Sequence, residues 1–375
     1  MQNNLESEDL ISFLENKSLF YDKIDFSYVK KAYELLQPYI TLPFVIHIVG
    51  TNGKGSTGRF LAHYLYKKDF KILHYSSPHI LNFCERIWLN GKDIDELSLE
   101  LAHKNLQKIF DAELLEKLTY FEYTTLLAIL LSSKKDYLVF EAGLGGEFDA
   151  TNVVKNDLSI ITKIGFDHQE FLGKTIEEIT KTKLRACDNK MLLASQEYPE
   201  VLEFAKDYDY FLAKEFDTSR LNLPKFLKQN LNTVLSALEY LGIEIDLELL
   251  KDCQIFGRCQ KIKENITIDV GHNVQGAKVL LEEFQGKKIN LVFASLEIKN
   301  YALVLEILKP IIKKVFLLDI QNDKMAKKED LTKVLKKLNL PFEDFKDIDS
   351  QEEYLVFGSF LCVEYFLNTY IFLRK

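Results

Sequence analysis

The sequence has few of the features that mark secreted, disulfide-rich or zinc-binding proteins. Its 375 residues include only five cysteines, and no two of them form a C-x-x-C pair. An odd number of scattered cysteines fits neither a disulfide framework nor the ligand spacing of a zinc site. We therefore expect reduced thiols, as in a cytoplasmic protein.

Long apolar runs and an excess of positive charge are also missing. No stretch approaches the about 18 apolar residues of a membrane span, and the polar start from Met1 to Asp9 is not typical of a secretory signal. The formal net charge of −8 argues against a nucleic-acid-binding protein. The sequence predicts a cytoplasmic protein, monomeric, with neither membrane nor nucleic-acid partners.

The order of strand-like and helix-like segments indicates an α/β protein with parallel sheets covered by helices. The expected strands are 44–49, 71–75, 137–140, 158–164, 266–270, 289–293, 315–319 and 355–357. The expected helices include 121–131, 231–241, 274–284, 303–312 and 331–338. A boundary at residue 258 gives a P-loop-containing parallel-sheet ATPase domain (1–258) followed by a smaller Rossmann-like α/β domain (259–375).

The clearest functional signal is a glycine-rich turn around Lys54, in the stretch HIVGTNGKGST (47–57). It lies between an expected strand and an amphipathic helix, where backbone N–H groups, the helix N-terminus and a lysine together suit phosphate oxygens. The usual Walker A pattern is broken, because Gly55 separates Lys54 from the first hydroxyl residue. A surface turn with a solvated lysine is the alternative, but the flanking strand and helix favour a nucleoside triphosphate site.

Polar residues follow the other expected strands of the first domain. Ser77 comes after one strand, Glu141 after the next, and His168 after a third. Ligands of α/β sheets bind at these carboxyl ends, and oxygen ligands suit Mg²⁺. For Glu141 the alternative is a capping or surface carboxylate, and for His168 a structural histidine.

These residues resemble the folylpolyglutamate synthase and dihydrofolate synthase family, within the Mur ligase superfamily of ATP-dependent amide-forming enzymes. The matching blocks follow the family's order across nearly the whole chain. They are HIVGTNGKGST (47–57), SSPHI (76–80), YFEYTT (120–125), EAGLGGEFDATN (141–152), ITKIGFDHQEFLGKTIEEI (161–179), the 229–232 segment, FGR (256–258), IDVGHN (268–273) and LVFGSF (355–360).

The resemblance implies an ATP-dependent carboxylate–amine ligase. It would join L-glutamate to dihydropteroate, to folates or to both, through an acyl phosphate, with ATP as co-substrate and two Mg²⁺ ions. The first domain would hold ATP and the pterin substrate, and the second would be the glutamate ligase domain. The implied metal ligands are Ser77, Glu141 and His168, with Lys183 as a further ligand if it is carbamylated. The implied catalytic residues are Lys54, His168 and Lys183.

Lys183 aligns with the lysine that is carbamylated in this family. A solvated helix lysine is the alternative, since Leu184 and Arg185 replace the family's small Ala-Gly pair.

The resemblance also implies the ligand contacts. The implied ATP-binding residues are Thr51, Asn52, Gly53, Lys54, Gly55, Ser56, Asn232, Arg258 and Asp269, which would place ATP in a cleft that closes before the chemistry. The implied pterin contacts are Phe121, Glu122, Tyr123, Thr124, Phe148, Asp149 and Ala150.

Other interpretations of these contacts stay open. An interdomain salt bridge could explain Arg258, a helix N-cap could explain Asp269, and a buried helix could explain 121–131. Glu147 stands where the family commonly has arginine, so that contact with an anionic ligand is missing.

Two other functions also remain. A cell-wall muramyl ligase of the same superfamily is disfavoured by the short stretch before Gly50. A nucleotide-binding regulator without ligase activity would not need Glu141 or Lys183.

Overall fold

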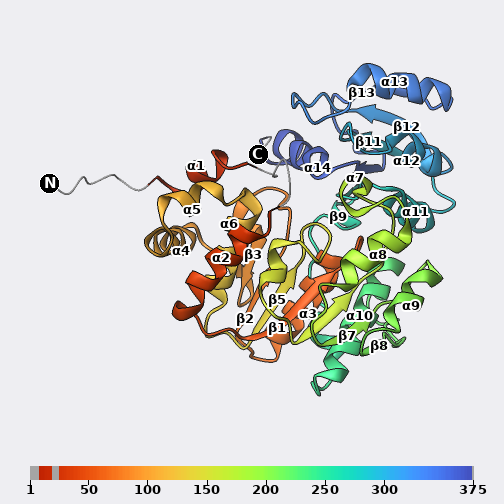
Figure 1. The fold of residues 1–375 in the computed structure, drawn as a ribbon. Coiled ribbons are helices and arrows are strands. Elements are labelled where there is room, and N and C mark those ends of the chain that lie inside the picture. Colours follow the sequence, from red (N-terminus) through yellow and green to blue (C-terminus); the bar gives the residue numbers. More distant parts are fainter. Residues whose placement is uncertain (1–7, 19–24, 374–375) are drawn as a thin grey trace. The chain divides into compact units, whose positions relative to one another are not determined.

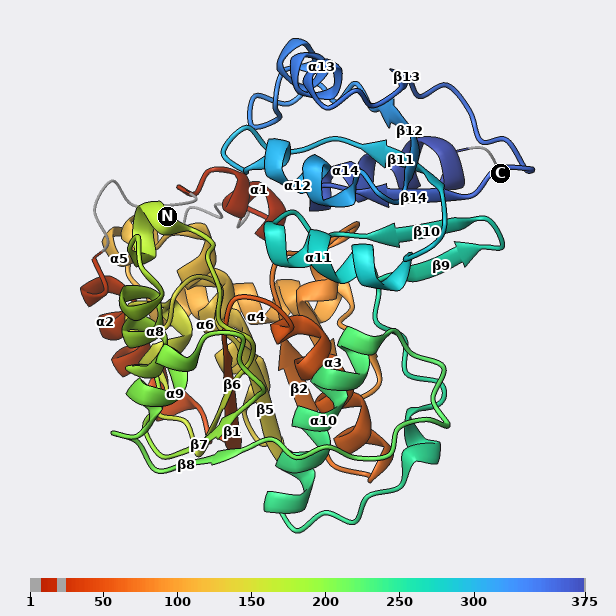
Figure 2. The same cartoon turned by 90° about the vertical axis from the view of Figure 1, so that its right-hand side faces the viewer.

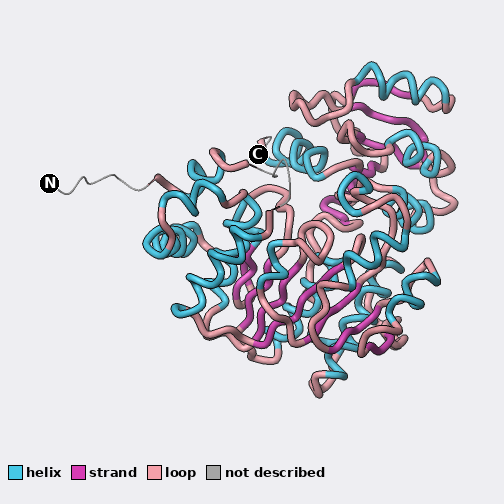
Figure 3. Tube along the Cα trace, in the orientation of Figure 1, coloured by secondary structure: helices cyan, strands magenta, loops and turns pink. Residues whose placement is uncertain are grey.

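The computed structural model describes residues 8–18 and 25–373, and the chain divides into two compact units. One unit extends to Leu221 and includes Gln229–Cys253, and the other comprises Asn222–Lys228 and everything from Gln254 onward. The boundary at residue 258 stays a prediction about domain organisation. Each unit is built on its own sheet, which the strands of Figure 3 trace.

Within the described residues, the first unit has an eight-stranded sheet in the order β4-β3-β2-β5-β1-β6-β7-β8. The strands are β1 (Phe44–Val49), β2 (Ile72–Tyr75), β3 (Ile87–Leu89), β4 (Lys92–Asp93), β5 (Tyr137–Glu141), β6 (Leu158–Ile161), β7 (Lys190–Leu193) and β8 (Tyr210–Leu212). The six strands from β2 to β8 in this order pair in parallel, whereas β3 and β4 are antiparallel.

Helices cover both faces of this sheet. They are α1 (Leu10–Glu15), α2 (Ser27–Leu36), α3 (Lys54–Lys67), α4 (Glu96–Ile109), α5 (Ala112–Lys117), α6 (Tyr120–Ser132), α7 (Gln169–Leu172), α8 (Ile176–Leu184), α9 (Pro199–Ala205) and α10 (Lys225–Tyr240), with short turns η1 (Gln37–Tyr39), η2 (Phe83–Arg86), η3 (Ala150–Val153) and η4 (Leu247–Leu250). Figure 2 shows α3 and α10 on one side of β1, β5 and β2, and α6, α8 and α9 on the other.

The side chains of the strands explain this layering. Alternate residues of a strand point to opposite faces, and β1 and β5 are buried on both faces along nearly their whole length, as a central parallel strand must be. Leu73 and Leu138 belong to the core that α2, α4 and α6 cover. His74 points the other way, where a Cβ on Gly58 of α3 would come within 2.4 Å of its Nε2 atom. Gly58 therefore lets α3 pack closely on the sheet.

The second unit has a six-stranded sheet among its described residues, in the order β13-β12-β11-β14-β10-β9. Its elements are β9 (Gln260–Lys263), β10 (Ile266–Asp269), α11 (Val274–Glu283), β11 (Ile289–Phe293), α12 (Tyr301–Leu308), β12 (Ile312–Leu317), α13 (Lys328–Lys337), β13 (Phe342–Asp344), β14 (Tyr354–Phe357), α14 (Phe360–Phe366) and a π-helical turn η5 (Leu367–Phe372). Only β9 is antiparallel in this described sheet.

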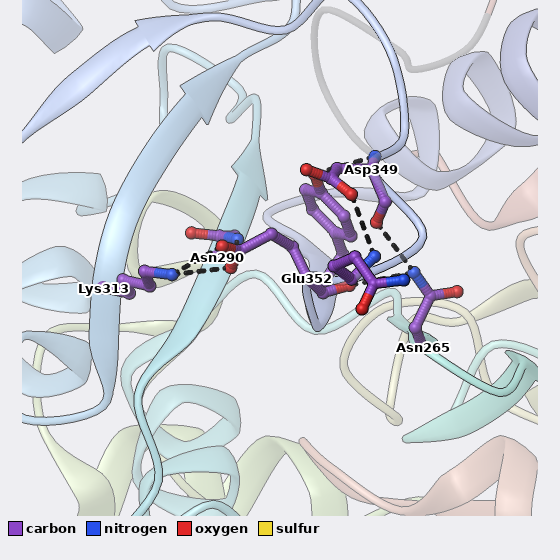
Figure 4. Close-up of polar contacts among 7 residues, drawn as sticks. Asn265, Asn290, Lys313, Asp349 and Glu352 are labelled. Atoms are coloured by element: carbon purple, nitrogen blue, oxygen red, sulfur yellow. Dashed lines mark hydrogen bonds and ion pairs between the residues drawn. The ribbon is translucent and has the colours of Figure 1, made fainter.

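A polar network fixes the loop that leads into β14 (Figure 4). The Glu352 carboxylate accepts hydrogen bonds from Asn290 Nδ2 at 2.9 Å and from Lys313 Nζ at 2.7 Å. Asn265 Nδ2 donates to the carbonyl oxygens of Asp349 and Glu352. Side chains from three strands or their turns thus hold the same short loop, which sets the register of β14 between β10 and β11.

Several expected boundaries were wrong. The helix expected over 303–312 ends at Leu308, two residues before Pro310, which has no N–H group to continue the helical hydrogen bonds. The strand expected at 315–319 runs from Ile312 to Leu317, and that expected to reach residue 164 ends at Ile161. The expected parallel sheets are confirmed, and each carries antiparallel strands at one edge.

Candidate active site

The strand order collects the predicted site residues at one edge of the first unit's sheet. In the order β2-β5-β1-β6 these strands are neighbours and parallel, and Figure 1 shows β2, β5 and β1 side by side. Ser77 follows β2, Glu141 ends β5, the glycine-rich turn follows β1 and His168 follows β6. Four segments that are far apart in the sequence therefore end beside one another, as ligand sites in α/β sheets require.

The phosphate loop has the geometry that the sequence predicts. β1 leads into Gly50, Gly53 takes a left-handed conformation with φ at +92°, and α3 begins at Lys54. The first hydrogen bond along the helix runs from the Thr57 N–H to the Gly53 carbonyl at 2.9 Å. The four N–H groups of residues 53–56 precede it and lie at the positive end of the helix, where phosphate binds.

Thr51 and Asn52 brace this loop. Both of their backbone N–H groups donate to the Lys163 carbonyl, at 3.0 and 3.1 Å. The Thr51 hydroxyl donates to the Gly165 carbonyl and accepts from the Gly165 N–H, each at 3.0 Å. Their observed contacts tie the phosphate loop to the segment that carries His168, and direct ATP contacts by the two residues stay a prediction.

Glu141 lies beside the phosphate-loop lysine. Its Oε1 atom is 4.0 Å from Lys54 Nζ, and the residue is only 4% exposed. A Cβ on Gly55 would lie 3.4 Å from Glu141 Oε2, so a glycine there leaves the carboxylate close to the backbone of α3. The surface-carboxylate alternative was wrong.

Lys183 is buried, and the solvated-lysine alternative was wrong as well. It is 3% exposed, and its Nζ atom donates to the carbonyl oxygens of Gly50 at 2.9 Å and Gly145 at 3.4 Å. Burial lowers the pKa of Lys183 to about 7, helped by the positive charge of Lys54 and opposed by nearby carboxylates. Burial therefore favours the uncharged form of this amine far more than in an exposed lysine.

The glycine-rich loop after β5 packs against the helix that carries Lys183. A Cβ on Gly146 would come within 2.8 Å of the Thr182 carbonyl, and the Glu147 N–H donates to the same carbonyl at 2.9 Å. The Glu147 side chain pairs with Arg185 at 2.9 Å. Two of the three residues that depart from the family pattern, Glu147 and Arg185, thus contact each other.

His168 begins α7 in a left-handed conformation, with φ at +49°. Its ring is about one-third exposed, 3.7 Å from Glu170 and 4.0 Å from Asp167 at the closest nitrogen–oxygen pairs. A partly exposed imidazole among carboxylates, at this edge of the sheet, remains able to take a metal ligand's role.

The predicted pterin segments divide into two groups. The Phe121 ring lies against Gly143, where a Cβ would meet the ring at 2.5 Å, and 6.0 Å from the Tyr75 ring. Phe148 is 57% exposed in the same glycine-rich loop. Stacking of a flat ligand on these two aromatic side chains stays a prediction.

The remaining members have partners inside the protein. Glu122 completes a capping box with Thr119, Tyr123 OH contacts His103 Nδ1 at 2.7 Å, and Thr124 Oγ1 contacts Tyr75 OH at 2.8 Å. The prediction of a buried helix over 121–131 is confirmed by α6.

Asp149 and Ala150 are buried next to the glycine-rich loop. The Asp149 carboxylate accepts from the Leu144 N–H at 2.7 Å and from the Thr151 hydroxyl at 2.6 Å, and burial raises its pKa. Ala150 begins η3 and is 5% exposed. Pterin contacts from these residues stay predictions.

In the second unit, Asp269 and Arg258 lie near each other. The Asp269 carboxylate accepts from the N–H groups of Cys259 at 2.8 Å and Gly271 at 2.7 Å. Burial raises the pKa of Asp269, and the charge of Arg258 opposes this. The N-cap of α11 is Asn273, so the interpretation of Asp269 as a helix N-cap was wrong.

The polar residue of α10 that contacts the phosphate loop is Asn230, which sequence reasoning missed. Asn230 Nδ2 donates to Ser56 Oγ at 2.7 Å. Asn232, which we expect to contact ATP beyond the loop, accepts a hydrogen bond from the Phe216 N–H at 3.3 Å, and its ATP contact stays a prediction. In the sequence, only their spacing along the helix distinguishes the two asparagines, because residues two positions apart point to different faces of a helix.

Comparison with known proteins now adds to this geometry. Residues 48–192 match the Mur ligase middle domain. A dihydrofolate synthase/folylpolyglutamate synthase of Haemophilus influenzae is 30% identical over 80% of this chain and 80% of that one. The chain belongs to the dihydrofolate synthase/folylpolyglutamate synthase family.

Solved structures of this family share the fold. A Helicobacter pylori folylpolyglutamate synthetase is 39% identical, with a TM-score of 0.77 over 98% of both chains. Escherichia coli FolC, solved in complex with DHPP and ADP, is 26% identical, with a TM-score of 0.85 over 98% of this chain and 99% of that one. The expected α/β architecture and the expected family are confirmed.

Among residues 8–18 and 25–373, no helix is long and apolar enough to cross a bilayer. In the same ranges no three His, Cys, Asp or Glu side chains gather as a metal-ligand set. Of the predicted Mg²⁺ ligands, only Glu141 and His168 are residues of these four types. The other predicted ligands are the Ser77 hydroxyl and a carbamylated Lys183.

Proposed function

We propose that the chain is an ATP-dependent ligase that joins the amino group of L-glutamate to the carboxylate of dihydropteroate and of folates. The observation that carries this proposal is the alignment of four strand ends, which brings a phosphate loop, Glu141, Ser77 and His168 to one edge of one sheet. Family membership supports the same reaction, an acid–amino acid ligation.

The reaction needs an activated carboxylate, because a carboxylate is a poor electrophile. An oxygen of the acceptor carboxylate bonds to the γ-phosphorus of ATP, and the bond to ADP breaks with its electron pair leaving on ADP. The glutamate amine then bonds to the acyl carbon, phosphate leaves, and the amine nitrogen loses a proton. Positioning and charge neutralisation dominate such phosphoryl transfer. Here they fall to the first turn of α3 and to Lys54.

Two of the three proposed donors, Ser77 and Glu141, offer oxygen atoms, which Mg²⁺ prefers while it keeps several waters, and His168 would add an imidazole nitrogen. A buried carboxylate at Glu141, beside the phosphate loop, is the kind of group that such an ion neutralises. Ser77, Glu141 and His168 would hold the ion, and it would offset phosphate charge.

Lys183 would add a ligand after reacting with carbon dioxide. The uncharged amine forms a nitrogen–carbon bond to CO₂ and releases a proton, leaving a carbamate anion. The lowered pKa supports this step, since only the uncharged amine reacts. A carbamate would turn a buried amine into an anionic oxygen ligand for a second Mg²⁺.

The test is phosphate release by the purified chain with MgATP and glutamate, adding either dihydropteroate or tetrahydrofolate, with products identified by mass. Release with both acceptors, each gaining one glutamate, is the expected result, and release with one would restrict the function to that step. Glu141→Gln is the matched variant, expected to stay folded and inactive. No release with either acceptor would contradict the proposal and favour a nucleotide-binding regulator.

A further inference from the structure

The side chain of Asn230, on α10, contacts the phosphate loop at Gly53 and Ser56. Its Nδ2 atom donates to Ser56 Oγ at 2.7 Å. A Cβ on Gly53 would come within 2.8 Å of Asn230 Oδ1 and 3.2 Å of its Cγ. The amide group therefore packs directly on the left-handed turn at Gly53, with no room for a side chain between them.

The same contact commits the Ser56 hydroxyl. Ser56 Oγ donates its proton to the Gly53 carbonyl at 3.1 Å and accepts from Asn230 Nδ2. A serine hydroxyl has one proton and two acceptor positions, so one acceptor position remains. Ser56 is 2% exposed, which makes this arrangement hard to replace with water. The phosphate-binding donors of the loop are then its backbone N–H groups and Lys54.

Helix geometry explains why Asn230 and Asn232 cannot share this task. Successive residues of an α-helix are about 100° apart, so two residues separated by one position point roughly 200° apart around the axis. Asn230 faces Ser56, and Asn232 reaches the Phe216 N–H. Only one of the two faces the phosphate loop.

We propose that Asn230 is a positioning residue of the nucleotide site. Through Ser56 and the turn at Gly53, it holds the first turn of α3 in the conformation that presents the N–H groups of residues 53–56 to the phosphates of a nucleoside di- or triphosphate. It acts without touching the reacting atoms.

The first test is binding of MgADP to the full chain by calorimetry, which needs no acceptor substrate and so does not depend on the proposed ligase activity. Asn230→Ala should raise the dissociation constant about five- to thirtyfold, since a partly buried hydrogen bond and its ordering effect are lost. Asn230→Asp, of the same shape, cannot donate to Ser56 and adds negative charge near phosphate. It should weaken binding more than Asn230→Ala does.

The control is Gln229→Ala, one residue earlier on the same helix, where the side chain is exposed to solvent. The dissociation constant of this variant for MgADP should stay within about twofold of the value for the original protein. Unchanged binding of MgADP by Asn230→Asp would overturn the proposal. Because aspartate keeps the shape of the asparagine side chain, this variant should fold even if Asn230→Ala does not.

A double-mutant cycle with Ser56→Ala separates positioning from general stability. If Asn230 acts through Ser56, the double variant should bind MgADP about as weakly as Ser56→Ala alone. Additive losses would overturn the proposal.

Steady-state assays of Asn230→Ala give a further readout. The KM for MgATP should rise, whereas kcat should stay within about threefold of its original value and the melting temperature should be nearly unchanged. A fall in melting temperature with an unchanged KM would indicate a merely structural role.

Discussion

Burial of Lys183 makes the stability of the protein depend on pH in a way that one substitution should remove. Its pKa lies at about 7 in the folded chain, against an ordinary value of 10.5. Each tenfold change in proton affinity is worth about 1.4 kcal/mol. The difference therefore corresponds to on the order of 5 kcal/mol in favour of the uncharged amine in the folded state.

The sign follows from where each state holds the proton. Between about pH 7 and pH 10 the unfolded chain keeps the Lys183 proton and the folded chain releases it, so the free energy of unfolding rises with pH. Stability is lost as pH falls through this range. For these folded and unfolded pKa values of Lys183, the free energy of unfolding should rise by about 2 kcal/mol between pH 7 and pH 9.

Lys183→Met keeps an unbranched side chain of similar length but has no proton to release. We expect it to lack this gain, so that the difference in unfolding free energy between variant and original protein changes by about 2 kcal/mol from pH 7 to pH 9. The measurement is urea unfolding at pH 7, 8 and 9 in chelator-containing buffer free of carbon dioxide, where neither metal nor carbamate forms.

Lys181→Met is the matched control, on the same helix. Lys181 is exposed and pairs with Glu177 at 2.6 Å, so its removal should shift the curve by a similar amount at every pH. If Lys183→Met also gave a constant difference across the pH range, the argument from burial would be refuted.

Three further predictions concern the site and the helices beside it. Glu141→Gln should lower ligase turnover by about 100-fold or more while the melting temperature changes little, and a variant with normal magnesium-dependent turnover would remove Glu141 from the metal site. Gly143→Ala should push the Phe121 ring aside and destabilise the chain by about 1–3 kcal/mol in urea unfolding, and an unchanged midpoint would count against the contact. Thr119→Ala removes the capping box with Glu122 and should lower the free energy of unfolding by about 1 kcal/mol, which thermal unfolding would check.

Some parts of the site could be foreseen from local patterns. The phosphate loop was recognisable because a buried strand, glycines, a lysine and an amphipathic helix follow one another within a short stretch. The capping box of α6 was also readable as Thr119 followed three residues later by Glu122, and it gives Glu122 a structural partner. Attention to that pattern would have separated Glu122 from the exposed candidates for pterin contact.

Other features depend on contacts between distant segments. The environment of Lys183 is set by Gly50 and Gly145, which lie 133 and 38 positions away in the chain. Pairing of Glu147 with Arg185, at 2.9 Å, turned two separate departures from the family pattern into one contact. No local periodicity reports such pairs, because they are created when loops from different strands meet.

The sequence by itself determined the α/β class, the phosphate loop and the residues that end each central strand, because these follow from hydrophobic periodicity and from glycine in short segments. Tertiary structure alone decided the strand order β2-β5-β1-β6, the antiparallel edges, the burial and lowered pKa of Lys183, and the choice of Asn230 over Asn232 at the phosphate loop. The physical reason is that side-chain environment depends on which surfaces pack together, and packing partners here come from segments far apart in the chain.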